Sequence, residues 1–150
     1  MYNIIKTNSD NADFKALIKL LDRDLLAIYG EQQSFFDQFN KIDAIKHVIV
    51  LYAGAEPVAC GAMKHYDADT MEVKRMFVKE QYRGQKLGLN VLQNVEAWAN
   101  ELGYSNCILE TGSGQDAAIR LYQNNGYRII ENYGQYIGVE NSICMMKAVG

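Results

Sequence analysis

The sequence predicts one α/β (α+β) domain over residues 1–150, with a mixed, mostly antiparallel sheet that helices flank. Between His47 and Val78, β-branched and aromatic runs are separated only by short turns, which is typical of an antiparallel meander. The period of apolar residues then becomes helical and another strand follows, which indicates a parallel crossover. A chain of 150 residues is long enough to bury one substantial core and too short to favour a second core.

The bulk composition favours a small-molecule partner over a polymer. A net charge of −3 and a pI near 5.4 argue against a broad basic surface for nucleic acid or an anionic membrane. The cysteines Cys60, Cys107 and Cys144 are far apart without CxxC spacing, so reduced, buried thiols are expected. Because the sequence contains no run of about 18 apolar residues and no secretory leader pattern, we expect a cytoplasmic protein.

The N-terminal part is predicted to contain a short strand and an amphipathic helix. Residues 2–6 are extended in character, and polar residues able to cap a helix follow, so the helix is expected to start near Asp10. Apolar residues then recur at three- and four-residue steps up to Tyr29 and Gly30. This stripe consists of Phe14, Leu17, Ile18, Leu21, Leu25 and Ile28. Residues 31–45 fit either a second short helix or a loop that lines a pocket, and we expect the helix.

Three consecutive strands are predicted in the middle of the chain. Residues 47–53 form the first, and a turn at residues 54–57, which holds the single proline, leads into a second strand that ends near Tyr66. Residues 67–69 supply the next turn, and residues 70–78 form the third strand. The short turns make all three neighbours antiparallel.

A long helix and a parallel strand follow this meander. Apolar residues from Leu87 to Leu102 mark the helix, and Gly103 is suited to the left-handed position beyond its end. The next strand, residues 107–110, is expected to lie parallel to residues 71–78. The carboxyl ends of these two strands would then share an edge of the sheet.

The C-terminal third is predicted to hold one short helix and two strands. The helix covers residues 117–125, and the strands cover residues 127–130 and 142–148. The intervening residues 131–141 are rich in tyrosine and glycine, too polar for a core strand and unusually aromatic for a linker. We expect this segment to close over a ligand.

The segment between the third strand and the long helix has the order of an anion-binding site. A strand, a tight loop and a helix start leave the first helical N–H groups without partners, and the helix dipole adds positive charge there. Arg83 and Lys86 provide charged donors, while Gly84 and Gly88 permit close approach of the backbone. This pattern predicts a phosphate or pyrophosphate site.

Four segments together carry a family resemblance: MEVKRMFVKEQYRGQKLG, WANELGY, LETGSGQDAAIRLYQNNGY and SICMMK. They resemble the GNAT superfamily of acyl-CoA-dependent N-acetyltransferases, and most closely its bacterial branch with an LETG strand end and an N-Y-G-x-Y segment. The resemblance spans nearly the whole chain. It implies a GNAT fold with splayed central strands, acetyl-CoA as the acyl donor, and direct transfer of the acetyl group to a small-molecule primary amine in a ternary complex.

The resemblance also implies which residues bind coenzyme A. The pyrophosphate loop of the family, R/Q-x-x-G-x-G/A, corresponds to Arg83, Gly84, Gln85, Lys86, Leu87 and Gly88. Lys86 replaces the inner glycine, and we expect right-handed helical geometry there, which tolerates a side chain that donates to phosphate. The pantetheine arm is expected to bond to the backbone of Met76, Phe77 and Val78. Asn124 and Asn125 are candidates to contact coenzyme A or, alternatively, to terminate the helix. The side chains of Met76, Phe77 and Val78 can equally be core residues.

Three residues are candidates for the proton transfers. The resemblance makes Glu72, directly or through a water, the first candidate for the base that deprotonates the amine, with Glu110 second. Tyr122 matches the tyrosine that often protonates the coenzyme A thiolate in this superfamily. Each has a structural alternative: Glu72 on an exposed strand face beside lysines, Glu110 orienting the following turn, and Tyr122 packing as an aromatic side chain.

Other functions and partners are less well supported by the sequence. A noncatalytic acyl-CoA-binding or sensing module is the main alternative, because Lys86 departs from the loop pattern. A nucleotide-binding loop is disfavoured because neither G-x-x-x-x-G-K-[ST] nor G-x-G-x-x-G occurs. His47 and His65 lack metal-ligand spacing, so no metal is expected, and Cys60 lacks the surroundings of a nucleophile. Candidate acceptor-binding aromatics, which can instead cover a homodimer interface, are Tyr29, residues 35–39, Tyr133 and Tyr136.

Overall fold

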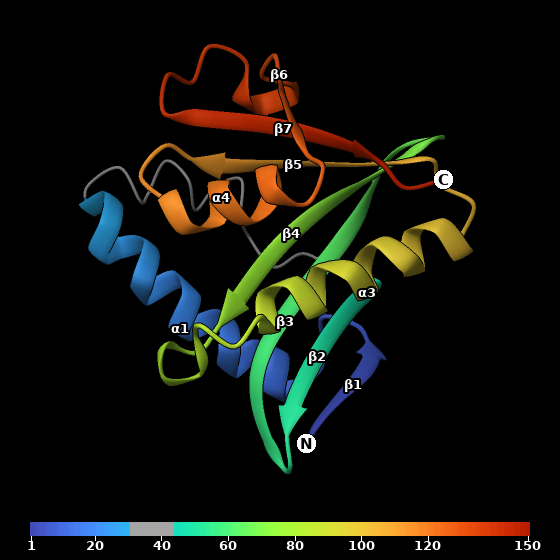
Figure 1. Ribbon diagram of the computed structural model, residues 1–150. Coiled ribbons are helices and arrows are strands. Elements are labelled where there is room, and N and C mark those ends of the chain that lie inside the picture. The colour runs from blue at the N-terminus through green and yellow to red at the C-terminus, as the bar shows by residue number, and fades with distance from the viewer. Residues whose placement is uncertain (31–43) are drawn as a thin grey trace. The chain divides into compact units, whose positions relative to one another are not determined.

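The computed structural model describes residues 1–30 and 44–150 (Figure 1). The chain divides into two compact units. The first unit consists of Met1–Lys64 and Val73–Val95, and the second of His65–Glu72 and Glu96–Gly150. The strands form a mixed seven-stranded sheet, flanked by helices, in the order β1-β2-β3-β4-β5-β7-β6. The predicted fold class is confirmed, whereas the single domain over residues 1–150 stays a prediction.

The first unit contains the predicted strands of the N-terminal half. β1 (Tyr2–Thr7), β2 (His47–Ala53) and β3 (Glu56–Asp67) pair antiparallel, and β4 (Thr70–Val78) follows. The first unit holds β3 up to Lys64 and β4 from Val73. The expected place of Pro57 in the turn is wrong, because Pro57 lies in β3 opposite Tyr52. The register shifts between Leu51 and Tyr52, and a residue without an N–H is tolerated near a strand start beside such an irregularity.

Helix α1 (Ala12–Tyr29) covers one face of the first unit. The side chain of Asn11 accepts the backbone N–H of Phe14 at 2.9 Å, so the helix is capped one residue beyond the expected Asp10. It ends at Gly30, whose φ of 55° is favoured by glycine. The inward stripe of α1 consists of Phe14, Leu17 and Ile18. It forms one core cluster with the strand residues Val48, Val50, Cys60, Ala62 and Phe77.

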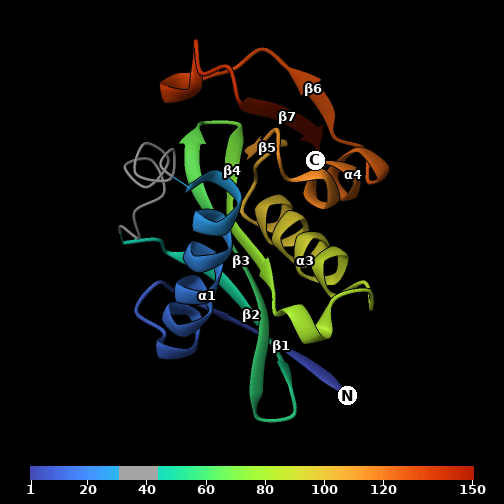
Figure 2. The ribbon, with the colours of Figure 1, turned by 90° about the vertical axis from the view of Figure 1, so that its left-hand side faces the viewer.

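The start of helix α3 (Leu87–Glu101) packs on the opposite face of these strands (Figure 2). A Cβ atom at Gly61 would lie 2.6 Å from the Sδ atom of Met76 and 2.8 Å from Cγ1 of Val91. Neighbouring strand residues point to opposite faces, so Cys60 faces α1 while Gly61 lets α3 approach. A side chain at position 61 would therefore force the side chains of Met76 and Val91 to shift.

The second unit contains β5 (Asn106–Gly112), α4 (Asp116–Asn124), β6 (Arg128–Ile130) and β7 (Ser142–Ala148). β5 pairs parallel with the start of β4, from Thr70 opposite Asn106 to Glu72 opposite Ile108, so the predicted crossover is confirmed. β7 pairs antiparallel with β5 and with β6. The splay expected beyond Glu72 concerns strand segments of different units and stays an expectation.

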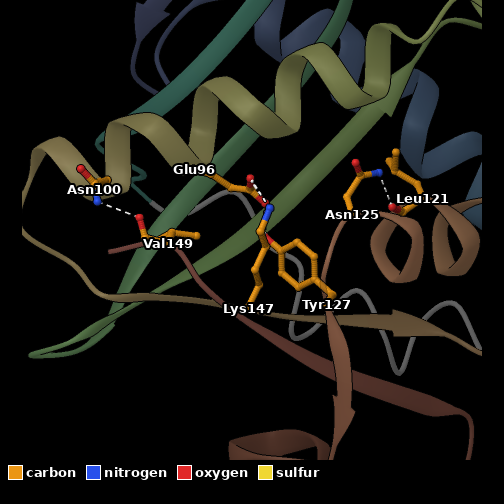
Figure 3. Close-up of polar contacts among 7 residues, drawn as sticks. All are labelled: Glu96, Asn100, Leu121, Asn125, Tyr127, Lys147 and Val149. Carbon is orange, nitrogen blue, oxygen red and sulfur yellow. Dashed lines mark hydrogen bonds and ion pairs between the residues drawn. The ribbon is translucent and has the colours of Figure 1, made fainter.

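A buried polar cluster joins the end of α3 to the C-terminal strands of the second unit (Figure 3). The Tyr127 hydroxyl donates to Oε2 of Glu96 at 2.8 Å, and the Lys147 ammonium lies 2.9 Å from Oε1. Lys147 also lies over the Tyr127 ring, 5.7 Å from its centroid. Glu96 is 8% exposed, and inside the protein Lys147 balances its charge while Tyr127 satisfies its second oxygen.

The prediction of reduced, buried cysteines is confirmed, since Cys60, Cys107 and Cys144 are all free and buried. Burial is the main cause that raises all three pKa values, to about 12 for Cys107 and about 11 for Cys144. These thiols therefore stay protonated at neutral pH and are poor nucleophiles.

Two further expectations concern the segment at residues 31–45 and the lack of a membrane span. The helix expected at residues 31–45 and the aromatic residues 35–39 lie outside the described residues, apart from the last two positions of that helix. Among the helices in residues 1–30 and 44–150, none has both the length and the apolar composition that a membrane span requires.

Candidate active site

The predicted strand, loop and helix start are present in the first unit. β4 ends at Val78, a short 3₁₀ turn covers Glu80–Tyr82, and α3 begins at Leu87. The backbone N–H of Asn90 bonds to the Lys86 carbonyl at 3.1 Å, so the N–H groups of the preceding turn lie ahead of the helical bonding pattern. Together with the helix dipole, this geometry can bind a phosphate group.

The backbone at Lys86 differs from the expectation. Right-handed helical geometry was expected, but Lys86 has a φ of 63°, in the left-handed region that favours glycine. A non-glycine residue in this conformation costs about 1 kcal/mol or more. The loop bends sharply here before α3 starts, which explains why the family pattern has glycine at this position. The Lys86 side chain is exposed, so its ammonium group can still reach a ligand.

The guanidinium of Arg83 is held at the end of β4. Its Nε donates to the Val78 carbonyl at 2.9 Å, and Nη2 lies 2.8 Å from Oδ2 of Asp24 in α1. The group also lies over the Phe77 ring, 5.7 Å from the centroid. Both charged side chains of this ion pair are nearly half exposed, and such surface pairs contribute only about 0–1 kcal/mol. A diphosphate can therefore compete with Asp24 for Arg83.

The other predicted cofactor residues of the first unit have structural roles as well. Phe77 is buried in the core cluster against α1, and the Sδ atom of Met76 lies on the α3 side of the strands. The Gln85 side chain accepts a hydrogen bond from the Tyr2 hydroxyl, which ties the loop to β1. The contacts of Met76 and Phe77 are made by their side chains, so both interpretations of these two residues stand, whereas the Val78 carbonyl already accepts Arg83.

Arg75 in β4 is a feature that the sequence analysis missed. Its φ of 60° is unusual for a residue within a strand, and its carbonyl accepts the Cys60 thiol at 3.4 Å. The guanidinium donates through Nη1 to Asp22 of α1 at 3.0 Å. Its Nε is buried, and no described residue accepts a hydrogen bond from it. An arginine directly before the apolar strand end Met76–Val78 was the signal available in the sequence.

The carboxylate of Glu72 is buried in the second unit. Glu72 is 8% exposed, and its Oε2 accepts the Tyr133 hydroxyl at 2.6 Å. The alternative that places Glu72 on an exposed strand face is therefore wrong. Burial, and then the negative charge of Glu72, raise the pKa of Tyr133, so this phenol stays a hydrogen-bond donor. Edge-to-face contacts with Tyr66 and Tyr136 fix the Tyr133 ring.

The carboxylate of Glu110 is also held by a hydroxyl group. The Ser142 hydroxyl at the start of β7 donates to Oε2 of Glu110 at 2.6 Å. Burial, followed by the charges of Glu110 and Glu72, raises the pKa of Tyr136. Tyr133 and Tyr136, which were expected on a loop that encloses the acceptor, are both buried. The sequence analysis missed Ser142, and it did not connect Tyr133 with Glu72.

Tyr122 and the end of α4 complete the candidate residues of the second unit. Tyr122 is 6% exposed, and its ring packs edge-to-face on that of Tyr127 with the centroids 5.6 Å apart, so Tyr122 contributes to the packing of the second unit. Burial, and then the charge of Glu110, raise the pKa of Tyr122, which keeps its hydroxyl protonated. Asn124 is exposed at the last position of α4, whereas Asn125 donates to the Leu121 carbonyl at 2.7 Å and closes the helix (Figure 3).

The structure thus groups the predicted residues by unit. Glu72, Glu110 and Tyr122 belong to the second unit together with Asn124, and the loop with the end of β4 belongs to the first. Within the described residues, no three His, Cys, Asp or Glu side chains are close enough together to hold a metal ion.

Comparison with known proteins assigns the family. Residues 14–127 match the model of the acetyltransferase (GNAT) family. The chain is 33% identical over 122 residues to an IAA acetyltransferase of Azospirillum brasilense, with 80% of each protein covered. A Klebsiella pneumoniae protein assigned to the acyl-CoA N-acyltransferases has a TM-score of 0.84 at 30% identity, over 100% of this chain and 99% of that one. A GNAT family acetyltransferase of Elizabethkingia anophelis with acetyl-CoA bound has a TM-score of 0.71 at 19% identity, over 98% and 97% of the two chains. This chain belongs to the acetyltransferase (GNAT) family.

Proposed function

We propose that this protein is an acetyl-CoA-dependent N-acetyltransferase that acts on the primary amine of a small molecule. Family membership supports acyl transfer, and the Elizabethkingia relative in fold has acetyl-CoA bound. The observation that carries the proposal is the start of α3, where the first-turn N–H groups follow a loop with Arg83 and Lys86. This arrangement suits the diphosphate of a coenzyme A ester.

The donor is assigned to the loop and strand of the first unit. Backbone N–H groups of residues 84–88 and the charged groups of Arg83 and Lys86 bind the diphosphate. The backbone of Met76, Phe77 and Val78 bonds to the pantetheine arm. Asn124 of the second unit is assigned a contact to coenzyme A because its side chain is exposed.

The base is assigned to Glu72. A primary amine of pKa about 10.4 is mostly protonated at pH 7, and its neutral form costs roughly 4–5 kcal/mol. The Glu72 carboxylate, directly or through a water, takes this proton, and the Tyr133 hydroxyl fixes its orientation. Glu110 is the second candidate, because the Ser142 hydroxyl orients it in the same way.

The transfer occurs directly between donor and acceptor. The neutral nitrogen attacks the thioester carbonyl carbon, so that a C–N bond forms and the C–S bond breaks. The proton of the nitrogen goes to the base, and the departing thiolate takes a proton from the Tyr122 hydroxyl. Because the pKa of Tyr122 is raised, its proton is present at neutral and mildly alkaline pH.

The test measures turnover and donor binding separately. Acetyl-CoA is incubated with the protein and a panel of small amines while free thiol is followed, and coenzyme A binding is measured by calorimetry. The proposal expects thiol release that rises with at least one amine. Tyr122→Phe, which removes the proposed proton donor, should slow this thiol release. Tyr104→Phe, a change outside the assigned residues, serves as its matched control.

A noncatalytic acyl-CoA-binding module is the second candidate. The left-handed backbone of Lys86 favours it, since a loop that departs from the family pattern can retain binding without turnover. Tight coenzyme A binding without amine-stimulated thiol release would establish this alternative and reject the catalytic proposal.

A further inference from the structure

Arg75 carries a charge that the proposed chemistry does not use. Its side chain is only 5% exposed, and its ion-pair partner Asp22 is 47% exposed. An arginine side chain keeps its positive charge in proteins. Asp22 meets this buried charge through a single contact, between Nη1 and Oδ1 at 3.0 Å. One nitrogen of the guanidinium is therefore paired with a carboxylate that is itself largely hydrated.

The other edge of this guanidinium lacks a described partner at Nε. The Nε atom is buried, and within residues 1–30 and 44–150 nothing accepts its hydrogen. A guanidinium presents its five N–H groups in a fixed fork, and Nε with the adjacent Nη2 forms an edge that can bind both oxygens of a carboxylate. A buried N–H without an acceptor is unfavourable, so a ligand oxygen at this edge would be strongly bound.

The strand holds this edge in place. Arg75 has a φ of 60° in β4, and its carbonyl is fixed by the Cys60 thiol at 3.4 Å. Asp22 holds the far end of the side chain from α1. A group that is fixed at both ends loses little conformational entropy when a ligand binds.

We infer that Arg75 binds a carboxylate and that the acceptor of the transfer carries this carboxylate in addition to its amine. The inference rests on the proposed function, because only an acetyltransferase has such an acceptor. A planar carboxylate matches the edge of the guanidinium, whereas a phosphate dianion would be repelled more strongly by Asp22. The first unit already has a loop suited to the phosphates of the donor.

The first experiment measures acceptor preference with matched pairs, each an amino acid and its carboxamide. The carboxylate member is expected to have a kcat/KM about 10- to 100-fold higher. Arg75→Met should remove this preference through KM, and Arg75→Lys, which keeps the charge without the fork, should retain part of it. Arg23→Met makes the same charge change at an exposed position of α1 and should keep the preference.

Measurement of coenzyme A binding shows whether Arg75 binds a carboxylate of the acceptor or a phosphate of the donor. Arg75→Met should leave the calorimetric Kd of coenzyme A unchanged, and a loss of donor affinity would assign Arg75 to a phosphate and overturn the inference. Equal kcat/KM within the pairs, or equal losses on both members in Arg75→Met, would also overturn it. If circular dichroism shows that Arg75→Met does not fold, the same measurements are made on Arg75→Lys, and a carboxylate preference equal to that of the wild type would then overturn the inference.

A binding readout without turnover distinguishes this inference from the proposed function. Calorimetric titration with N-acetyl amino acids and their amides should show about tenfold tighter binding of the acids. Thiol release without carboxylate preference would reject the role of Arg75 and leave the acetyltransferase function intact. Absence of thiol release with every amine, while the acids still bind, would reject the function and retain the carboxylate site.

Discussion

The two units hold their charged candidate residues in different ways. In the first unit, the Arg83 guanidinium is paired with Asp24, and the two side chains are 48% and 42% exposed. In the second unit, Glu72 and Glu110 each accept a hydroxyl hydrogen at 2.6 Å, from Tyr133 and Ser142. The loop arginine Arg83 is thus held by an exposed ion pair, whereas the two candidate carboxylates are held by short hydrogen bonds.

This difference suits the two tasks that we propose. Exposed ion pairs are weak and screened by salt, so their partners can be exchanged for a ligand that enters and leaves. Hydrogen bonds to a carboxylate in a buried setting are shorter and stronger, and they fix a group before the reaction starts. The comparison therefore predicts large effects on turnover in the second unit and moderate effects on donor affinity in the first.

The largest effect is expected for Glu72→Gln. The amide keeps the shape and can still accept the Tyr133 hydrogen, but it cannot take a proton, so kcat/KM should fall by roughly 1,000-fold. Thiol-release kinetics measures this loss. The deficit should shrink as the pH rises toward the pKa of the acceptor amine, about 10.4, because solvent then supplies the neutral amine.

Two controls test whether Glu72 acts through its charge. Tyr133→Phe keeps the carboxylate and removes its donor, so its activity should fall between those of the wild type and Glu72→Gln. Glu80→Gln, at an exposed position, should have normal activity. A Glu72→Gln deficit that is the same at all pH values would assign Glu72 a structural role only.

Tyr122→Phe should have the next largest effect. The change removes the proton donor for the thiolate, so kcat should fall about 100-fold while the Kd of coenzyme A changes little. Because the pKa of Tyr122 is raised, its proton is retained beyond the ordinary tyrosine pKa of about 10. The pH profile of kcat should consequently show no loss of Tyr122 function below about pH 10. Equal changes in kcat and Kd would contradict this assignment.

Arg83→Ala should act mainly on donor affinity. Loss of a charged donor to the diphosphate is expected to raise the calorimetric Kd of coenzyme A about tenfold, with a smaller change in kcat. Asp24→Asn is the matched control, because it removes the competing carboxylate and should leave the affinity equal or higher. An unchanged Kd in Arg83→Ala would mean that the guanidinium serves only Asp24 and the end of β4.

Most strands and helices of this protein follow from local signals. The bounds of β2 and β4 agree with the predicted residues 47–53 and 70–78, because turns and β-branched runs mark both ends. Pro57 was misplaced for the same reason: proline signals a turn, yet it is tolerated near a strand start.

The contacts of the candidate site depend on information that local patterns lack. The bond between Tyr133 and Glu72 joins residues 61 positions apart, and no periodicity encodes it. The Arg75 guanidinium is paired with α1 across 53 positions. The site residues were therefore predictable as types on strands and loops, whereas their hydrogen-bond partners required the folded chain.

The smallest effect is expected for substitutions of Lys86, the residue that replaces the inner glycine of the loop pattern. Two substitutions distinguish the role of the side-chain charge from that of the backbone conformation. Lys86→Gly relieves the left-handed backbone at φ 63°, so the free energy of unfolding should rise by about 0.5–1 kcal/mol, measured by denaturant titration. Lys86→Ala removes the charge and keeps the strained backbone, which makes it the matched control. If the Lys86 ammonium contacts the diphosphate, both variants should bind coenzyme A several-fold more weakly. Tighter binding by Lys86→Gly alone would instead show that backbone shape limits the loop, and Lys86 would then be a cost to donor binding rather than a charged donor.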